Sequence, residues 1–255
     1  MNFSLAIDDD LAEEICKFRT NQQCDVDRVE KTLHYYKGYP IFTKNYFNRY
    51  YGDRNIQSNV LQSTSHIDWN SLESVCKSTI YKVILSSQRN VSFPYVSIYD
   101  DKIESNFTAT FFKNEPRQKA LEHLRSLLES ARCIFIYDLY LTNNWASFIS
   151  FAQKCFPQKQ LSIFYPKEID SGGNASYHHI KQEQKLTQQQ CVQIIQAGQS
   201  LWSFKPDRNH QSFSNLHDRY LIIDNKIEVI FTSGIHHLIN TDKDFTYIVR
   251  QLSHK

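Results

Sequence analysis

The spacing of apolar residues changes along the chain and divides it into two regions. Up to about residue 85 the apolar positions recur at helical spacing, as with Val26, Val29 and Leu33. Acidic residues open the first such stretch, and a glycine and a proline end the second. The pattern predicts a helical N-terminal region over residues 1–90, with helices near residues 8–20, 25–40 and 68–84.

From residue 93 the pattern alternates between strands and helices. Residues 95–99 and 107–112 alternate apolar and polar side chains around a polar turn, which predicts a hairpin. The run "CIFIYDLYL" at 133–141 is almost entirely apolar and is typical of a strand covered on both faces. Strands and helices then alternate to the end of the chain. Residues 93–255 therefore predict an α/β domain, a mixed sheet with helices on both faces.

Composition narrows the classes of function. The 255 residues are 41% hydrophobic, which favours a globular protein, and the net charge of +2 means that any polyanion site must be local. Six scattered cysteines without a C-x-x-C pair indicate buried thiols rather than a metal site. The chain also lacks the glycine motifs of nucleotide cofactors. We expect no metal, no cofactor, no membrane span and a cytoplasmic location.

The stretch "NLHDRYLIIDN" at 215–225 carries the clearest chemical signal. In an extended strand His217 and Arg219 point to the same side. A guanidinium can hold two phosphate oxygens, and an imidazole can attack phosphorus or carry a proton near neutral pH. Asp224 lies seven residues after His217, so strict alternation sends it to the other face. Either the strand bulges or Asp224 serves the turn of a hairpin, for which "DNK" is an ordinary signal.

The same residues carry a family resemblance. The pattern His217-x-Arg219, four residues, then Asp224 resembles the H-x-K-x-x-x-x-D signature of the phospholipase D superfamily, with arginine in place of lysine. The form "HDRYLI", together with Asp138 and Tyr140 in the early strand, is most similar to the phospholipase D-like domains that follow microtubule-interacting and trafficking domains, and to bacterial relatives, some of them linked to phage defence. The likeness covers about residues 93–255.

The resemblance implies a metal-independent phosphodiesterase. His217 would be nucleophile or acid, Arg219 the phosphate clamp, and Asp224 would orient the motif. The family pairs two signatures, and the second H-x-K here, His179-x-Lys181, lacks the aspartate. A single signature implies a homodimer with two copies of His217 at one site. Ser233 would contact phosphate, and His236 would supply a further proton carrier.

These observations leave two classes of function open. One is a nuclease acting on DNA or RNA, as an antiviral defence effector controlled by the N-terminal region or by a regulatory partner protein. Basic residues near the late strands favour it, namely Lys205, Arg208 and His210. The other is a non-catalytic module that binds a phosphoinositide head group or a nucleic-acid end in the same cleft. A lipid transesterase ranks last, because no membrane-docking helix stands out.

Overall fold

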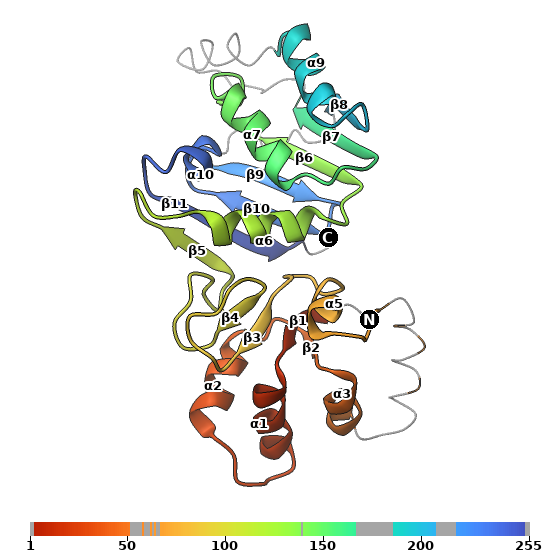
Figure 1. Cartoon of the computed structure of the whole chain (residues 1–255), viewed down its shortest axis with the longest axis vertical. Coiled ribbons are helices and arrows are strands. Elements are labelled where there is room, and N and C mark those ends of the chain that lie inside the picture. Colours follow the sequence, from red (N-terminus) through yellow and green to blue (C-terminus); the bar gives the residue numbers. More distant parts are fainter. Residues whose placement is uncertain are drawn as a thin grey trace, which may run out of the picture. The chain divides into compact units, whose positions relative to one another are not determined.

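The computed structural model describes residues 3–51, 58, 62, 64, 67–138, 140–166, 186–207 and 218–252. The chain divides into two compact units, Met1–Phe107 and Thr108–Lys255 (Figure 1). The division lies after Phe107 rather than near residue 90, because the segment up to Phe107 packs with the first unit: the Phe107 ring stacks on Tyr81 with centroids 3.7 Å apart.

The first unit contains a four-stranded sheet with the order β2-β1-β3-β4, in which all neighbouring strands are parallel. Its elements in chain order are β1 (Phe3–Ile7), α1 (Asp9–Arg19), α2 (Val26–His34), β2 (Tyr39–Ile41), α3 (Lys44–Tyr51), α5 (Leu72–Cys76), β3 (Ile84–Ser86) and β4 (Tyr95–Ser97).

The prediction of a purely helical N-terminal region is therefore wrong, although α1, α2 and α5 form where helices were expected. Strand β1 is buried at all five positions, so it shows no polar alternation that would mark it as a strand. Strand β3 has three residues, too few for a period to be read, and it was merged with the preceding helix.

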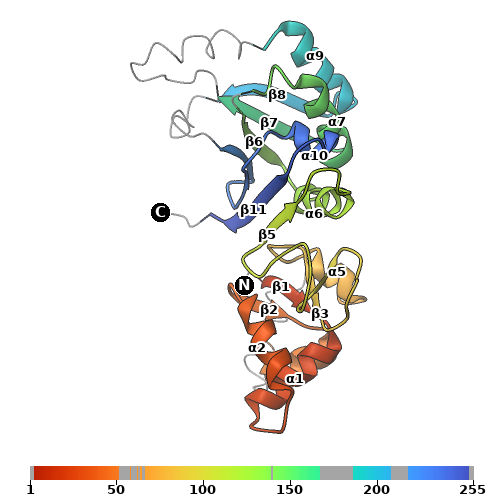
Figure 2. The ribbon, with the colours of Figure 1, turned by 90° about the vertical axis from the view of Figure 1, so that its left-hand side faces the viewer.

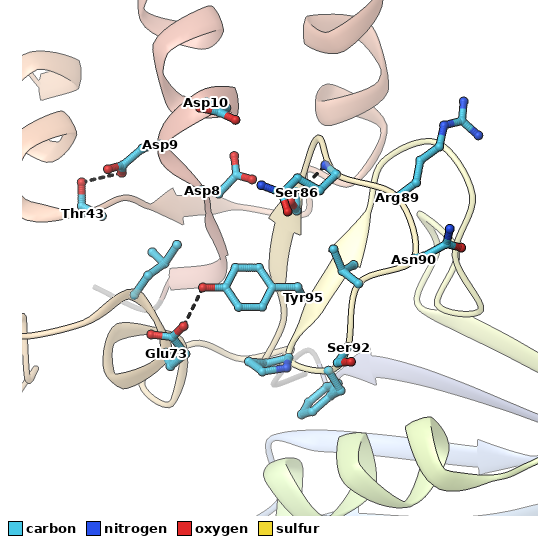
Figure 3. A pocket seen from close by; sticks show the side chains of 15 residues that line it. Asp8, Asp9, Asp10, Thr43, Glu73, Ser86, Arg89, Asn90, Ser92 and Tyr95 are labelled. Atoms are coloured by element: carbon cyan, nitrogen blue, oxygen red, sulfur yellow. Dashed lines mark hydrogen bonds between the residues drawn. The ribbon is translucent and has the colours of Figure 1, made fainter.

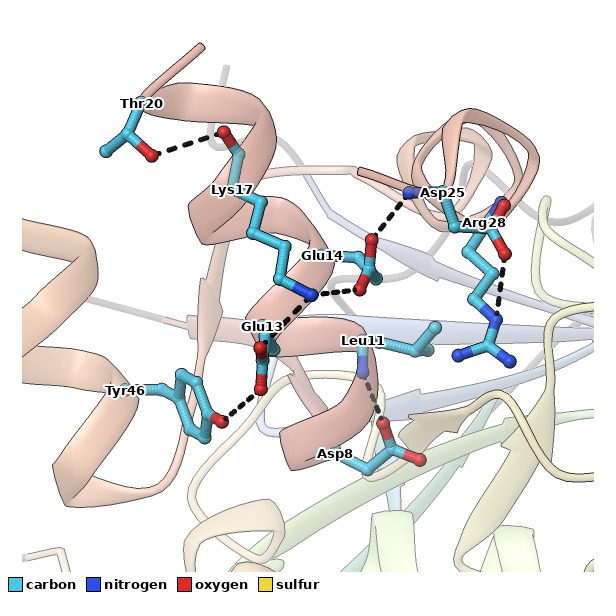
Figure 4. A network of polar contacts seen from close by, with 9 residues as sticks. All are labelled: Asp8, Leu11, Glu13, Glu14, Lys17, Thr20, Asp25, Arg28 and Tyr46. Atoms are coloured by element: carbon cyan, nitrogen blue, oxygen red, sulfur yellow. Dashed lines mark hydrogen bonds and ion pairs between the residues drawn. The ribbon is translucent and has the colours of Figure 1, made fainter. Parts of the chain in front are cut away.

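Polar contacts connect the helices of the first unit (Figure 4). The Nζ atom of Lys17 on α1 lies 3.1 Å from a carboxylate oxygen of Glu13 and 2.8 Å from one of Glu14. The Tyr46 hydroxyl on α3 donates to Glu13 at 3.2 Å, and the backbone N–H of Asp25 at the start of α2 donates to Glu14 at 2.6 Å. Exposed pairs add little stability, so the network mainly fixes how α2 and α3 lie against α1.

The second unit is built on a seven-stranded mixed sheet with the order β5-β11-β10-β9-β6-β7-β8. Its elements are β5 (Thr108–Phe111), α6 (Gln118–Leu128), β6 (Cys133–Tyr137), α7 (Trp145–Cys155), β7 (Leu161–Pro166), α9 (Gln188–Ala197), β8 (Trp202–Asp207), β9 (Arg219–Ile223), β10 (Ile227–Phe231), α10 (His236–Asn240) and β11 (Phe245–Gln251). Strands β6, β7 and β8 are parallel, and the other pairs are antiparallel. The predicted α/β class with a mixed sheet is confirmed.

The described helices of this unit do not cover both faces of the sheet as expected. The chain passes from β5 to β6, from β6 to β7 and from β7 to β8 in one direction across the sheet. Right-handed crossovers that all advance in one direction place α6, α7 and α9 on the same face. Figure 2 shows α6, α7 and α10 together on one side of the strands. Every second residue of β6 and β9 contributes to an apolar cluster that Ile230 of β10 completes, namely Phe135, Tyr137, Tyr220, Ile222 and Ile230.

The predicted hairpin between residues 95–99 and 107–112 is wrong. Strand β4 pairs with β3 in the first unit, and β5 pairs with β11 in the second. Alternation shows which face of a strand is buried but carries no information about which strand lies beside it. Among the helices of the described ranges, none has the length and apolar character needed to cross a membrane.

Candidate active site

Three strands of the second unit bring polar residues to one edge of the sheet. Arg219 begins β9 and pairs with Phe231 near the end of β10. On the other side of β9, Tyr220 pairs with Tyr137, so Asp138 directly after β6 comes to lie beside Arg219. Because β9 runs antiparallel to both neighbours, its amino end meets the carboxyl ends of β6 and β10.

Arg219 is held by its neighbours at this edge. Its side chain is buried, with Nε 3.7 Å from Oδ1 of Asp138, and its guanidinium carbon lies 5.4 Å from the centre of the Tyr140 ring. The Tyr140 backbone N–H donates to the same Oδ1 at 2.9 Å. A buried charge pair with a flat aromatic contact restricts the side chain to few rotamers. The site thus presents an oriented guanidinium, which suits the recognition of phosphate oxygens.

Asp138 is a buried carboxylate, and its environment sets its protonation. Burial raises its pKa, because the charged form loses hydration. The Tyr140 N–H, the Arg219 guanidinium and the His236 ring act in the opposite direction. The main contacts of Asp138 are therefore with Arg219 and the Tyr140 N–H inside the site rather than with water.

His236 is a described histidine that interacts electrostatically with both Asp138 and Arg219. Burial is the main cause that lowers its pKa, and the neighbouring His237 lowers it further, while Asp138 raises it. Its ring lies 3.8 Å from the His237 ring between centroids, and within the described part of the chain its Nδ1 has no hydrogen-bond partner. A neutral imidazole with one unoccupied nitrogen can accept or relay a proton.

Two further features position His236. His237 pairs through Nδ1 with Oδ1 of Asp242 at 2.7 Å, which fixes the second histidine of α10. Gly234 lies directly under the His236 ring, and a methyl group there would overlap the ring atoms. Ser233 is half-buried and donates at 3.4 Å to the Asp244 backbone oxygen, so its hydroxyl is at the same edge of the sheet.

Asp224 lies at the other end of β9, away from Arg219. Its Oδ1 accepts the backbone N–H groups of Arg132 at 2.9 Å and Cys133 at 2.8 Å. Asp224 and Asn225 have φ of 50° and 53°, as in a type I′ hairpin turn, and β9 pairs with β10 without a bulge. Five strand residues separate the two ends by roughly 16 Å. Of the two alternatives, the structure has the turn, and Asp224 also anchors the start of β6.

The remaining predicted residues fall partly outside the described ranges. His217, His179, Lys181, Arg208 and His210 all lie outside them. Arg219, Ser233 and His236 come together at one sheet edge, and His217 precedes Arg219 by two residues. In the described ranges no three His, Cys, Asp or Glu side chains are grouped so that they could hold a metal ion.

Sequence reasoning did not select Asp138, His237 or Asp242 as site residues. Asp138 has two signals in the sequence, its place in the family resemblance and its position as a charged residue that ends an apolar run. The pairing of His237 with Asp242 depends on the turn after α10, which the spacing alone does not predict. Neither a scan against protein-family models nor a search of curated proteins finds a match to this chain.

Proposed function

We propose that the second unit is a metal-independent phosphodiesterase that cleaves nucleic acid. The observation that carries the proposal is the oriented guanidinium of Arg219, held by Asp138 at the sheet edge to which α10 also brings the imidazole of His236. Arg219 follows His217 by two residues, in the spacing that resembles the phospholipase D signature.

In the proposed reaction an imidazole nitrogen of His217 attacks phosphorus, and the bond from phosphorus to the leaving oxygen breaks. Arg219 stabilises the charge on the non-bridging oxygens, and the leaving oxygen takes up a proton. Water then attacks the phosphohistidine, releases the phosphate ester and restores His217. A metal is not needed, because the histidine is the nucleophile and the guanidinium balances the charge.

The second imidazole has two possible sources. The single signature favours a homodimer in which a second copy supplies its His217. His236 offers an imidazole in the same chain, next to Arg219. Sedimentation and activity measurements together separate the two sources. A monomer that cleaves would assign the proton transfer to His236. Loss of all activity in a dimer of one wild-type chain and one His217→Ala chain would assign it to the partner.

A non-catalytic phosphate-binding module is the second candidate. Arginine replaces the usual lysine at position 219, as in the trafficking relatives that the sequence resembles, and the adjacent Asp138 partly neutralises its charge. For the nuclease, the setting implied by the resemblance is a bacterial defence effector controlled by the N-terminal region or by a partner; for the binding module, the resemblance implies a phosphoinositide head group or a nucleic-acid end as ligand.

Hydrolysis in the presence of chelator tests the proposal. Single- and double-stranded DNA and RNA are incubated with the wild type, Arg219→Ala and the control Arg125→Ala, which removes an exposed arginine of α6. We expect cleavage by the wild type and the control, and a loss of about two to three orders of magnitude in Arg219→Ala. Binding of a labelled oligonucleotide without cleavage by any of the three proteins would favour the binding module.

A further inference from the structure

The first unit contains a cavity that the proposed phosphodiesterase does not use. It is a solvent-open cavity of about 800 Å³, a volume typical of small-molecule sites, and all its lining residues belong to the first unit (Figure 3). The turn from β1 into α1 forms one wall, and the connection from β3 to β4 with the start of α5 forms the others.

The cavity lies where parallel sheets usually bind ligands. The chain leaves β1 for β2 on one side and later returns to β3 on the other side of β1. The carboxyl ends of β1 and β3 therefore flank the point where the strand order reverses, and ligands of open α/β sheets bind in that crevice. Asp8 directly follows β1, Ser86 ends β3, and both line the cavity.

The charge of the lining favours a cation. Four carboxylates and one arginine line the cavity, namely those of Asp8, Asp9, Asp10, Glu73 and Arg89. The Arg89 guanidinium lies 5.0 Å from the centre of the Tyr99 ring, and Figure 3 shows this side chain pointing away from Asp8 and Tyr95. Phosphate groups would therefore meet a net negative surface.

The carboxylates come from different elements. Asp8 follows β1 and its Oδ1 accepts the Leu11 N–H at 2.9 Å, whereas Glu73 belongs to α5 and accepts the Tyr95 hydroxyl at 2.6 Å. Over the described ranges they form no set that could ligate a metal ion. Carboxylates on separate walls suit an organic cation with several N–H donors better than a single metal ion.

Part of the acidic character has a purely structural explanation. Asp8 caps α1, and Asp9 and Asp10 in its first turn stabilise the helix dipole. Glu73 lies across the cavity and is also in the first turn of a helix, but α5 has only five residues, so its dipole explains this charge less well. Helix ends do not account for the apolar wall beside these carboxylates, which includes Phe93, Pro94 and the ring of Tyr95.

We propose that this cavity binds a small organic cation, a ligand with an ammonium or guanidinium group on an apolar stem. Asp8 and Glu73 pair with the cationic groups, and Tyr95 and Phe93 contact the stem. Aromatic rings next to carboxylates bind such cations through both charge and the ring face. The residues of this site belong to the first unit, whereas the residues of the proposed phosphodiesterase belong to the second.

Calorimetric titration of the full chain with agmatine tests this proposal, since agmatine carries a guanidinium and an ammonium on one apolar stem. Asp8→Asn keeps a residue that caps helices well but removes the charge. Glu73→Gln keeps an acceptor for the Tyr95 hydroxyl. Glu30→Gln, on the exposed side of α2, is the matched control for the charge change.

We expect agmatine to bind one site per chain, with the dissociation constant raised about tenfold or more in each cavity variant and unchanged in Glu30→Gln. Because the two substitutions lie on different walls, one of them remains informative if the other impairs folding. Absence of agmatine binding, or equal binding by all four proteins, would overturn the proposal. Binding of adenosine, ATP or Mg²⁺ in place of agmatine would overturn the assignment to a cation of this class.

Discussion

Replacement of Asp224 tests whether this signature residue is structural. Its Oδ1 accepts two backbone N–H groups at the start of β6, and its φ of 50° is a conformation that alanine adopts only under strain. Losing two hydrogen bonds to a charged acceptor, one exposed and the other partly buried, and placing alanine in the left-handed region together cost roughly 3 to 4 kcal/mol. Asp224→Ala should therefore lower the free energy of unfolding of the second unit by about that amount.

Two companion variants separate the causes. Asp224→Asn keeps an acceptor and tolerates the backbone conformation, so we expect a loss below about 1 kcal/mol. Asp224→Gly removes the acceptor without backbone strain and should fall between the other two. Urea denaturation followed by intrinsic fluorescence reports on the second unit through Trp145 and Trp202, and all variants carry Trp69→Phe to remove the signal of the first unit.

Two results would contradict a structural role of Asp224. An Asp224→Ala protein within about 0.5 kcal/mol of the wild type would show that the two hydrogen bonds are not important. An Asp224→Asn protein that is stable but inactive would place the carboxylate in the chemistry, despite its position at the far end of β9.

Four further changes act on the site itself. Gly234→Ala should displace the His236 ring and lower the cleavage rate about tenfold with the oligomeric state unchanged, and an unchanged rate would remove His236 from the mechanism. Asp138→Asn keeps the acceptor for the Tyr140 N–H but removes the charge that orients Arg219, so KM should rise more than kcat falls in steady-state kinetics; a loss confined to kcat would contradict a positioning role. Arg219→Lys should keep more activity than Arg219→Ala but less than the wild type, and equal rates for all three would exclude a clamp. Because the pKa of His236 is lowered on folding, the free energy of unfolding should fall as the pH drops from about 7.5 to about 5.5. His236→Gln should reduce this pH dependence. The raised pKa of Asp138 acts in the opposite direction, so the quantity to compare is the difference in unfolding free energy between the wild type and His236→Gln at each pH.

The part of the fold that sequence predicted well is local. The hairpin of β9 and β10 follows from two apolar runs around Asp224 and Asn225, and both residues do have the positive φ that such a turn requires. The mixed α/β class follows in the same way from alternating strands and helices. Each of these features depends on residues that are close in sequence.

What the sequence did not predict depends on distant partners. Strand β5, the first strand of the second unit, pairs with β11, the last strand along the chain, and no spacing near residue 108 indicates this. Asp138 becomes a site residue only because β6 and β9 are neighbours in one register, which places it next to Arg219. The parallel sheet of the first unit was missed because its short buried strands show no alternation.

Trapping of the covalent intermediate tests the central claim most directly. The full chain is mixed with end-labelled oligonucleotide in excess chelator, quenched in base, and the label on the protein is mapped for the wild type and for His217→Ala. We expect a base-stable, acid-labile label on His217 that is absent from the variant, together with loss of cleavage. Cleavage that continues in His217→Ala, or that proceeds in the wild type without any protein-bound label, would contradict the proposed histidine phosphodiesterase.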